Sequence, residues 1–217
     1  MKRKLGLIYK KLFSYFGPQH WWPGNSLFEV IVGAILTQGT NWNNVEKAIN
    51  NLKRENLLIP RKLDGISQQR LASLIRPCGY FNVKAKRLKS FLSVLFKSYN
   101  GSLKNMFYLA TPRLREALLD INGIGPETAD SILLYAAQRP VFVVDAYTKR
   151  ILLRQRLISE NSSYHEIQDL FMRNLKEDVS FFNEYHALLV KLGKETCAKS
   201  NPKCSLCPIR GGCNKNG

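Results

Sequence analysis

Four cysteines near the end of the sequence have a spacing typical of a bound metal centre. They follow the pattern C-x6-C-x2-C-x5-C and are Cys197, Cys204, Cys207 and Cys213. Four thiolates can hold a zinc ion or a [4Fe–4S] cluster, and the spacing alone leaves both open. We expect no disulfide framework, because nothing in the sequence reads as an export signal. The fifth cysteine, Cys78, is expected to be a small buried residue.

A second candidate for chemistry is Asp145, which directly follows the apolar run 141–144. An aspartate in this position either caps the helix that follows or is a reactive carboxylate held at the edge of a core. The pattern alone does not decide between these two roles.

A glycine turn lies twenty residues before Asp145. Gly123 and Gly125 flank Ile124, and Pro126 follows them. Glycine tolerates the positive φ angles of a tight turn, and proline is accepted at the first position of a helix. The turn therefore predicts a hairpin between two helices whose second member presents backbone N–H groups to a phosphate. Such turns also occur without any ligand. Apolar residues recur at helical spacing after the turn, at Ala129, Ile132, Leu133 and Ala136.

The composition favours a polyanionic partner. Among 217 residues, 33 are Lys or Arg and 16 are Asp or Glu, giving a formal net charge of +17. This excess points first to nucleic acid. Apolar residues make up 45%, enough for one large domain or two small ones. No segment has the length of a membrane span, so we expect a cytoplasmic, nucleoid-associated protein that does not bind membranes.

The periodicity of apolar residues predicts an all-α fold. The segment 141–144 is expected to be an extended connector, because it has no plausible partner strand. Helices are expected at 4–16, 27–36, 43–55, 67–76, 83–99, from 111 into the hairpin, and at 146–157, 164–176 and 181–194.

The hairpin, Asp145 and the cysteine spacing together resemble the endonuclease III class of helix-hairpin-helix DNA glycosylases, over nearly the whole chain. The resemblance implies two helical lobes: a six-helix domain at 23–138, and a second domain formed by 1–22 plus 139–217. It also implies that the loop 197–213 holds a structural [4Fe–4S] cluster rather than zinc. That loop would carry Lys199, Lys203 and Arg210 to the DNA backbone.

The resemblance assigns roles to single residues. Asp145 matches the catalytic aspartate, Gln38 the residue that fills the gap left by an extruded nucleotide, and Tyr80 the wedge that enters the base stack. The hairpin would grip the DNA backbone, and its carbonyls bind a monovalent cation in some members. The implied partner is double-stranded DNA with a damaged base, bound by a monomer. The expected backbone contacts are Gly123, Ile124, Gly125, Lys84, Lys86, Arg87, Lys149 and Arg150.

One departure from the family concerns the reaction. Members that also cut the strand have a lysine two residues after the second hairpin glycine, and this chain has Glu127 there. A carboxylate cannot form an imine. We therefore expect a monofunctional glycosylase with weak or absent AP lyase activity; Lys149, one helical turn beyond Asp145, is the alternative amine.

The Trp-Trp-Pro segment at 21–23, the apolar helix that ends in Leu-Thr-Gln at 36–38, an aromatic residue at position 42 and a glutamate at position 127 are four further features. Together they resemble the bacterial 3-methyladenine DNA glycosylases, a subgroup that commonly lacks the cysteine cluster. This likeness implies an alkylated purine as substrate, and the cationic base would favour electron-rich rings. Each tryptophan could equally be core packing, and Glu127 could simply cap its helix. The expected base pocket comprises Trp21, Trp22, Trp42, Glu127 and Tyr147.

Two other functions remain open from the sequence. The first is an endonuclease III-like glycosylase and AP lyase that acts on oxidised or deaminated pyrimidines. The second is a non-catalytic module that binds damaged DNA.

Overall fold

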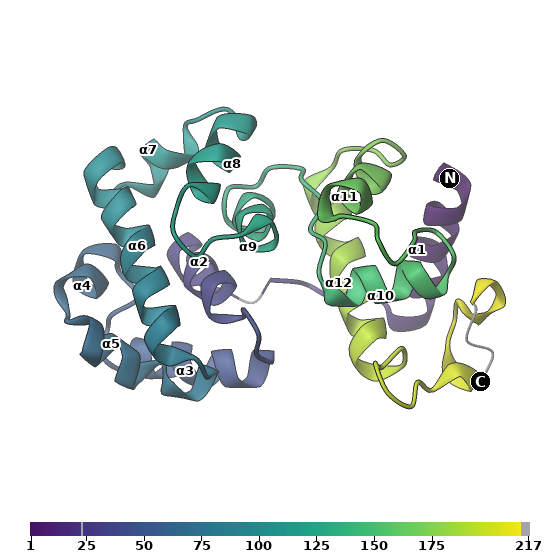
Figure 1. Cartoon of the computed structure of the whole chain (residues 1–217), viewed down its shortest axis with the longest axis horizontal. Helices are drawn as coiled ribbons and strands as arrows, with labels where there is room; N and C mark the ends of the chain where they lie inside the picture. Colours follow the sequence, from purple (N-terminus) through teal and green to yellow (C-terminus); the bar gives the residue numbers. More distant parts are fainter. Residues whose placement is uncertain (23, 214–217) are drawn as a thin grey trace. The chain divides into compact units, whose positions relative to one another are not determined.

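The computed structural model describes residues 1–22 and 24–213, and these are helical without any β-strand among them (Figure 1). The segment 141–144 is extended and buried, as predicted. The chain divides into two compact units. We call Met1–Trp22 with Pro140–Gly217 the discontinuous unit, and Pro23–Arg139 the continuous unit. None of the helices in the described residues combines the length and hydropathy that crossing a membrane requires.

The continuous unit contains the six predicted helices and two further short ones. The latter, α4 and α7, have 6 and 5 residues, too few for a helical period to show in the sequence. Helix α9 continues through a π-helical turn, Ile132–Ala136. The bounds are α2 Leu27–Leu36, α3 Trp42–Arg54, α4 Pro60–Gly65, α5 Gln68–Leu74, α6 Phe81–Tyr99, α7 Leu103–Phe107, α8 Thr111–Leu119 and α9 Pro126–Ser131.

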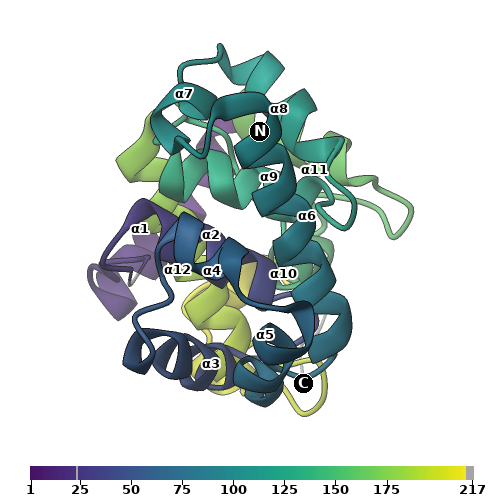
Figure 2. The same ribbon diagram turned by 90° about the vertical axis from the view of Figure 1, so that its left-hand side faces the viewer.

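Helix α2 forms the centre of the continuous unit. Every residue from Phe28 to Leu36 is buried, and a helix that is apolar on all sides belongs inside a core. The Ser26 hydroxyl accepts a hydrogen bond from the Glu29 N–H and caps the helix. Around α2 pack α3, α6, α9 and the π-helical turn. Helix α5 lies along α6 on the outside of this core (Figure 2).

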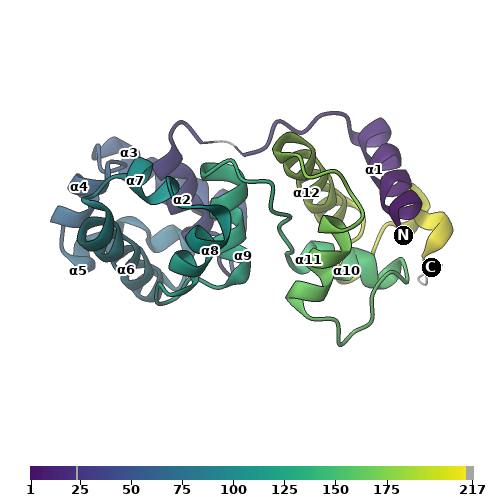
Figure 3. The ribbon, with the colours of Figure 1, turned by 90° about the horizontal axis from the view of Figure 1, so that it is seen from above.

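The discontinuous unit is assembled from distant parts of the sequence around α12. Its helices are α1 Lys2–Phe16, α10 Ala146–Arg154, α11 Tyr164–Met172 and α12 Val179–Glu195. Helix α12 packs against both α1 and α10 (Figure 3). Leu5 and Leu12 of α1 are fully buried, and each such leucine contributes about 1.5–3 kcal/mol. The Tyr185 hydroxyl donates to the Leu5 carbonyl at 2.9 Å, which fixes α1 on α12.

Candidate active site

Asp145 lies at the N-terminal end of α10 and caps that helix. Its Oδ1 accepts a hydrogen bond from the Thr148 N–H at 2.7 Å. The buried segment 141–144 delivers the residue to this position, and its side chain keeps 13% of its surface exposed. The two roles left open by the sequence are therefore compatible, because a capping carboxylate can also be accessible.

His186 of α12 lies beside the Asp145 carboxylate, and the sequence alone did not point to this neighbour. Its Nε2 lies 3.6 Å from Asp145 Oδ2. Burial by itself raises the pKa of the Asp145 carboxyl, but the attraction of His186 and the hydrogen bond from the Thr148 N–H outweigh it. The net pKa of Asp145 is therefore lowered, and the carboxylate is ionised at neutral pH. The available signal was a histidine at a buried position of a predicted helix.

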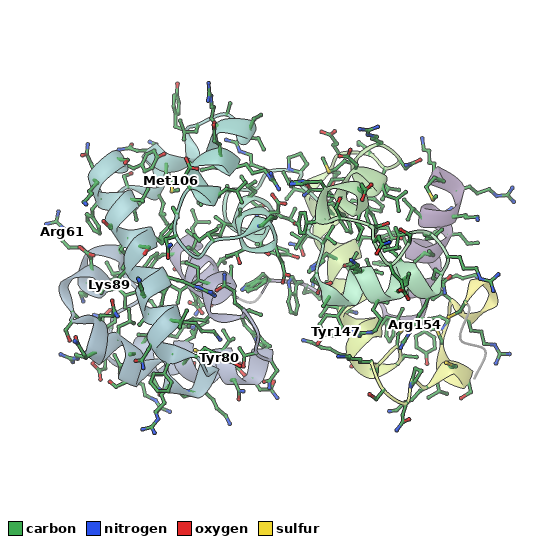
Figure 4. All side chains as sticks on the ribbon, in the orientation of Figure 1. Arg61, Tyr80, Lys89, Met106, Tyr147 and Arg154 are labelled. Atoms are coloured by element: carbon green, nitrogen blue, oxygen red, sulfur yellow. The ribbon has the colours of Figure 1, made fainter. Side chains whose placement is uncertain are left out.

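The other end of α10 is joined to the cysteine loop by two arginines. Arg154, labelled in Figure 4, donates to Cys197 Sγ at 3.0 Å and to the Ala198 carbonyl at 2.8 Å. Arg150 donates to the carbonyls of Cys197 at 2.9 Å and Gly193 at 3.0 Å. These internal carbonyls engage the Arg150 guanidinium, and its contact with the DNA backbone stays a prediction.

The four cysteines of the loop line one small cavity, together with Thr196, Pro202 and the two arginines Arg154 and Arg210. Burial raises the pKa of the Cys207 thiol, and the other three cysteines raise it further. Within the described residues, no three potential ligands converge as they would around one metal ion. Four thiols lining one cavity are a donor set that either zinc or an iron–sulfur cluster can use, and the cluster stays a prediction.

The hairpin has the predicted glycine turn with one difference. Gly123 has φ +89°, but Gly125 is extended at φ −92°, so only the first glycine needs a left-handed conformation. A Cβ on Gly123 would lie 2.3 Å from Cγ of Arg87, whereas one on Gly125 would meet nothing within 4 Å. Ile124 is buried, and Pro126 occupies the first turn of α9 as predicted.

Gln38 and Arg87 are brought together with the hairpin. The Gln38 amide donates to the Gly123 carbonyl at 3.0 Å and to the Thr128 hydroxyl at 2.8 Å. Arg87 donates to Gln38 Oε1. Both side chains therefore support the glycine turn in this structure. Their predicted roles, filling a gap in DNA for Gln38 and contacting phosphate for Arg87, stay predictions.

Lys84, predicted as a DNA backbone contact, lies buried in this structure rather than on the surface. It is 1% exposed, and its Nζ donates to the carbonyls of Leu36 at 2.9 Å and Cys78 at 2.7 Å. Burial lowers the pKa of its ammonium group. Cys78 is buried, as expected. Lys84 therefore joins the end of α2 to the turn that carries Tyr80.

Tyr80, labelled in Figure 4, precedes α6 in a left-handed conformation with φ 46° and is 77% exposed. An aromatic ring held out of the surface in this way suits insertion between bases. Lys86, on the next turn of α6, is exposed and remains a predicted phosphate contact.

The residues of the predicted base pocket come from both units. Trp21 and Trp22 meet edge to face at 5.4 Å, and Lys194 Nζ of α12 lies 5.6 Å from the centre of the Trp21 ring. Tyr147, labelled in Figure 4, packs against Gly193, where a Cβ would lie 2.4 Å from its ring. These residues belong to the discontinuous unit.

The remaining pocket residues, Trp42 and Glu127, belong to the continuous unit. Trp42 begins α3 and is half-buried, and Glu127 is exposed in the first turn of α9. The pocket as a whole stays a prediction. Lys149, the alternative amine, donates to the Ser162 carbonyl at 3.0 Å.

Comparison with known proteins places these features in a family. Residues 32–177 match the HhH-GPD superfamily of base excision DNA repair proteins. A candidate DNA repair glycosylase of Methanocaldococcus jannaschii is 50% identical over 208 residues, covering 95% of this chain and 94% of the relative. Endonuclease III of Thermotoga maritima is 27% identical over 186 residues, covering 86% and 82%.

Solved structures agree with this assignment. The H. pylori 3-methyladenine DNA glycosylase MagIII, bound to 1,N6-ethenoadenine, is 30% identical with a TM-score of 0.75, covering 88% of this chain and 95% of the other. An endonuclease III–DNA complex has a TM-score of 0.85 at 21% identity, covering 99% and 95%, which shows the fold. The chain therefore belongs to the HhH-GPD superfamily of base excision DNA repair proteins.

Proposed function

We propose that this protein is a monofunctional DNA glycosylase that extrudes damaged bases, above all alkylated purines, and hydrolyses their N-glycosidic bond. The observation that carries the proposal is the ionised, partly exposed Asp145 carboxylate at the start of α10. Support for the substrate class comes from the 30% identity to MagIII, a 3-methyladenine glycosylase.

The first step of the proposed reaction is extrusion of the base. A base inside a duplex is out of reach, and flipping it out costs on the order of a few kcal/mol. The exposed Tyr80 ring would offset part of this cost by occupying the vacated space in the stack. The glycine hairpin would hold the flanking phosphate, since Gly125 leaves open space where another residue has a Cβ.

The second step is cleavage of the bond to C1′, during which positive charge develops on the sugar. An ionised carboxylate next to that charge stabilises the transition state more than the ground state. His186 and the Thr148 N–H fix Asp145 in one orientation, which suits this role. A cationic base such as 3-methyladenine leaves readily, so no strong general acid is needed.

The absence of the family lysine supports hydrolysis over strand cleavage. Glu127 stands at that position and cannot form an imine. We propose accordingly that base release is much faster than nicking.

We further propose that Cys197, Cys204, Cys207 and Cys213 hold a [4Fe–4S] cluster. The shared cavity and the crowding of four thiols support it. Such a cluster supplies structural cross-linking when bound, and it would order the loop that Arg150 and Arg154 tie to α10. Iron and sulfide analysis together with a broad absorbance near ~400 nm tests this against zinc.

A lesion panel assayed with and without alkaline treatment tests the function. We expect release of 3-methyladenine from methylated DNA, with most nicks appearing only after alkali. Equal nicking without alkali on an oxidised pyrimidine would favour the endonuclease III-like alternative, which the 27% identity to the Thermotoga maritima enzyme supports. Tight binding to an abasic analogue without any base release would indicate a non-catalytic module.

A further inference from the structure

Lys194 is an exposed lysine in the discontinuous unit that neither the resemblance nor the proposed hydrolysis uses. It lies on α12, the helix that also supplies His186 to Asp145. Its Nζ lies 5.6 Å from the centre of the Trp21 ring. Within the described residues, no hydrogen bond or ion pair of Lys194 accompanies this ring contact.

Other lysines near the candidate sites are held differently. Lys84 and Lys149 donate to backbone carbonyls at distances between 2.7 and 3.0 Å. Lys191, one turn before Lys194 on α12, forms an ion pair with Glu195 at 2.6 Å. An amine that must attack a substrate has to be free of such partners, and Lys194 meets this condition.

The electrostatic surroundings of Lys194 favour a neutral amine. Burial lowers the pKa of its ammonium group, although the charge of Asp145 partly opposes this shift. The preceding residue, Gly193, packs against Tyr147, two positions after Asp145, so this end of α12 lies beside the start of α10. A lysine attacks a carbonyl to form an imine only as the neutral amine, and a lowered pKa increases that fraction.

We propose that Lys194 forms an imine with the abasic sugar left after base release, and so gives this protein a slow AP lyase activity without a hairpin lysine. The proposal rests on the proposed function, because that function puts the abasic sugar beside Asp145. It also explains how strand cleavage can be weak without being absent.

The chemistry needs no added oxidant or reductant. The neutral Nζ attacks the C1′ aldehyde of the ring-opened abasic sugar, and loss of water leaves an iminium ion. Removal of a C2′ proton by a base then breaks the C3′–O bond and releases the 3′-side phosphate as leaving group. Hydrolysis of the conjugated imine restores the Lys194 amine.

The test uses the full-length protein and DNA with a preformed abasic site, so that base release is not required. Borohydride reduces the imine to a stable covalent adduct, which gel electrophoresis detects and peptide mass spectrometry maps. We expect an adduct on Lys194, and its loss in both Lys194→Gln and Lys194→Arg. The arginine variant keeps the positive charge but cannot form the imine, which separates nucleophilicity from charge.

The matched control is Lys191→Gln on the same helix, which should trap as much DNA as the unmodified protein. Thermal unfolding and binding to an abasic analogue verify that the Lys194 variants are folded. The proposal is overturned if the unmodified protein gives no adduct, or if the adduct survives in both Lys194 variants. Mapping of the adduct to Lys149 or to the Met1 amino group would overturn it as well.

Failure of the lyase proposal is distinguishable from failure of the glycosylase proposal. Release of free 3-methyladenine from methylated DNA tests the glycosylase proposal independently of the adduct. If free base is released but no covalent adduct is trapped, only the proposed role of Lys194 is refuted. If an adduct is trapped but no base is released, only the proposed hydrolysis of alkylated purines is refuted.

Discussion

The two units position their candidate functional groups in different ways. In the discontinuous unit, Asp145 is held by His186, 41 positions further along the chain, and α10 is held by Arg150 and Arg154 through the cysteine loop. In the continuous unit, the hairpin depends on the left-handed backbone conformation of Gly123. Lysine side chains of this unit donate hydrogen bonds to backbone carbonyls of the same unit. Lys84 and Lys89 both donate to buried or half-buried carbonyls.

A basic residue near a DNA-binding motif therefore need not contact phosphate, because it can instead donate to backbone carbonyls of its own chain. Lys89, labelled in Figure 4, donates to three carbonyls at the end of α4, those of Leu63, Asp64 and Ile66. Lysines in such places stabilise loops that cannot satisfy their own carbonyls. Substitutions can therefore separate the cations and backbone positions that stabilise the fold from the groups that act on DNA.

The largest effect is expected for Asp145→Asn. The amide can still accept from the Thr148 N–H, but it has no negative charge for the developing sugar cation. We expect single-turnover base release to fall on the order of 100- to 1,000-fold, the usual loss for one electrostatic group. Binding to an abasic analogue should change little, and undiminished release would remove Asp145 from the mechanism.

The next effect concerns Lys84 and is one of stability. In Lys84→Met, the carbonyls of Leu36 and Cys78 lose their donor in a buried site. We expect a loss of about 1–3 kcal/mol for each carbonyl left without a partner. Urea titration measures it, and Lys86→Met on the exposed side of the same helix is the control with almost no loss. Equal stability of both variants would contradict the internal role of Lys84.

The two hairpin glycines should respond differently to alanine. Gly123→Ala puts a Cβ into Arg87 at a positive φ, so we expect destabilisation of about 1–3 kcal/mol. Gly125→Ala has room for its Cβ, and its stability should be nearly unchanged while its affinity for DNA falls. Thermal unfolding and fluorescence anisotropy measure the two properties. Similar melting temperatures for both variants would argue against the observed turn.

The pH dependence of stability provides a smaller effect with a definite sign. The pKa of Asp145 is lowered from its ordinary value of 3.8, so its ionised form stabilises the fold. This contribution is fully present above pH 3.8 and is lost as the pH falls through the lowered pKa. Comparison with Asp145→Asn by denaturant titration should show a difference that is constant near neutral pH and shrinks below that value. If the difference in free energy of unfolding grew as the pH fell, the pKa of Asp145 would be raised rather than lowered.

The smallest effect is expected for Lys86→Gln. Removal of one exposed phosphate contact should reduce the salt dependence of DNA binding by about 0.9 in the logarithmic slope, at nearly equal cost for all sequences. Binding titrations at several salt concentrations measure this slope. An unchanged slope would show that Lys86 does not contact the DNA backbone.

Local patterns in the sequence were enough to predict the helical class and the hairpin turn, because these depend on the period of apolar residues and on turn chemistry. The helix 27–36 was predicted with its observed bounds, since the Ser26 cap and a run that is apolar except for Glu29 specify it locally. The short α4 and α7 were not predicted, since fewer than two helical turns carry no readable period.

Which side chains contact one another could be read only from the folded chain. His186 beside Asp145, the buried position of Lys84, the binding of Arg150 to carbonyls and the free amine of Lys194 each depend on packing between helices far apart in the sequence. A lysine looks the same in a sequence whether it faces water or a buried carbonyl. Its role is set by the groups around its terminal nitrogen, and folding alone brings those groups together.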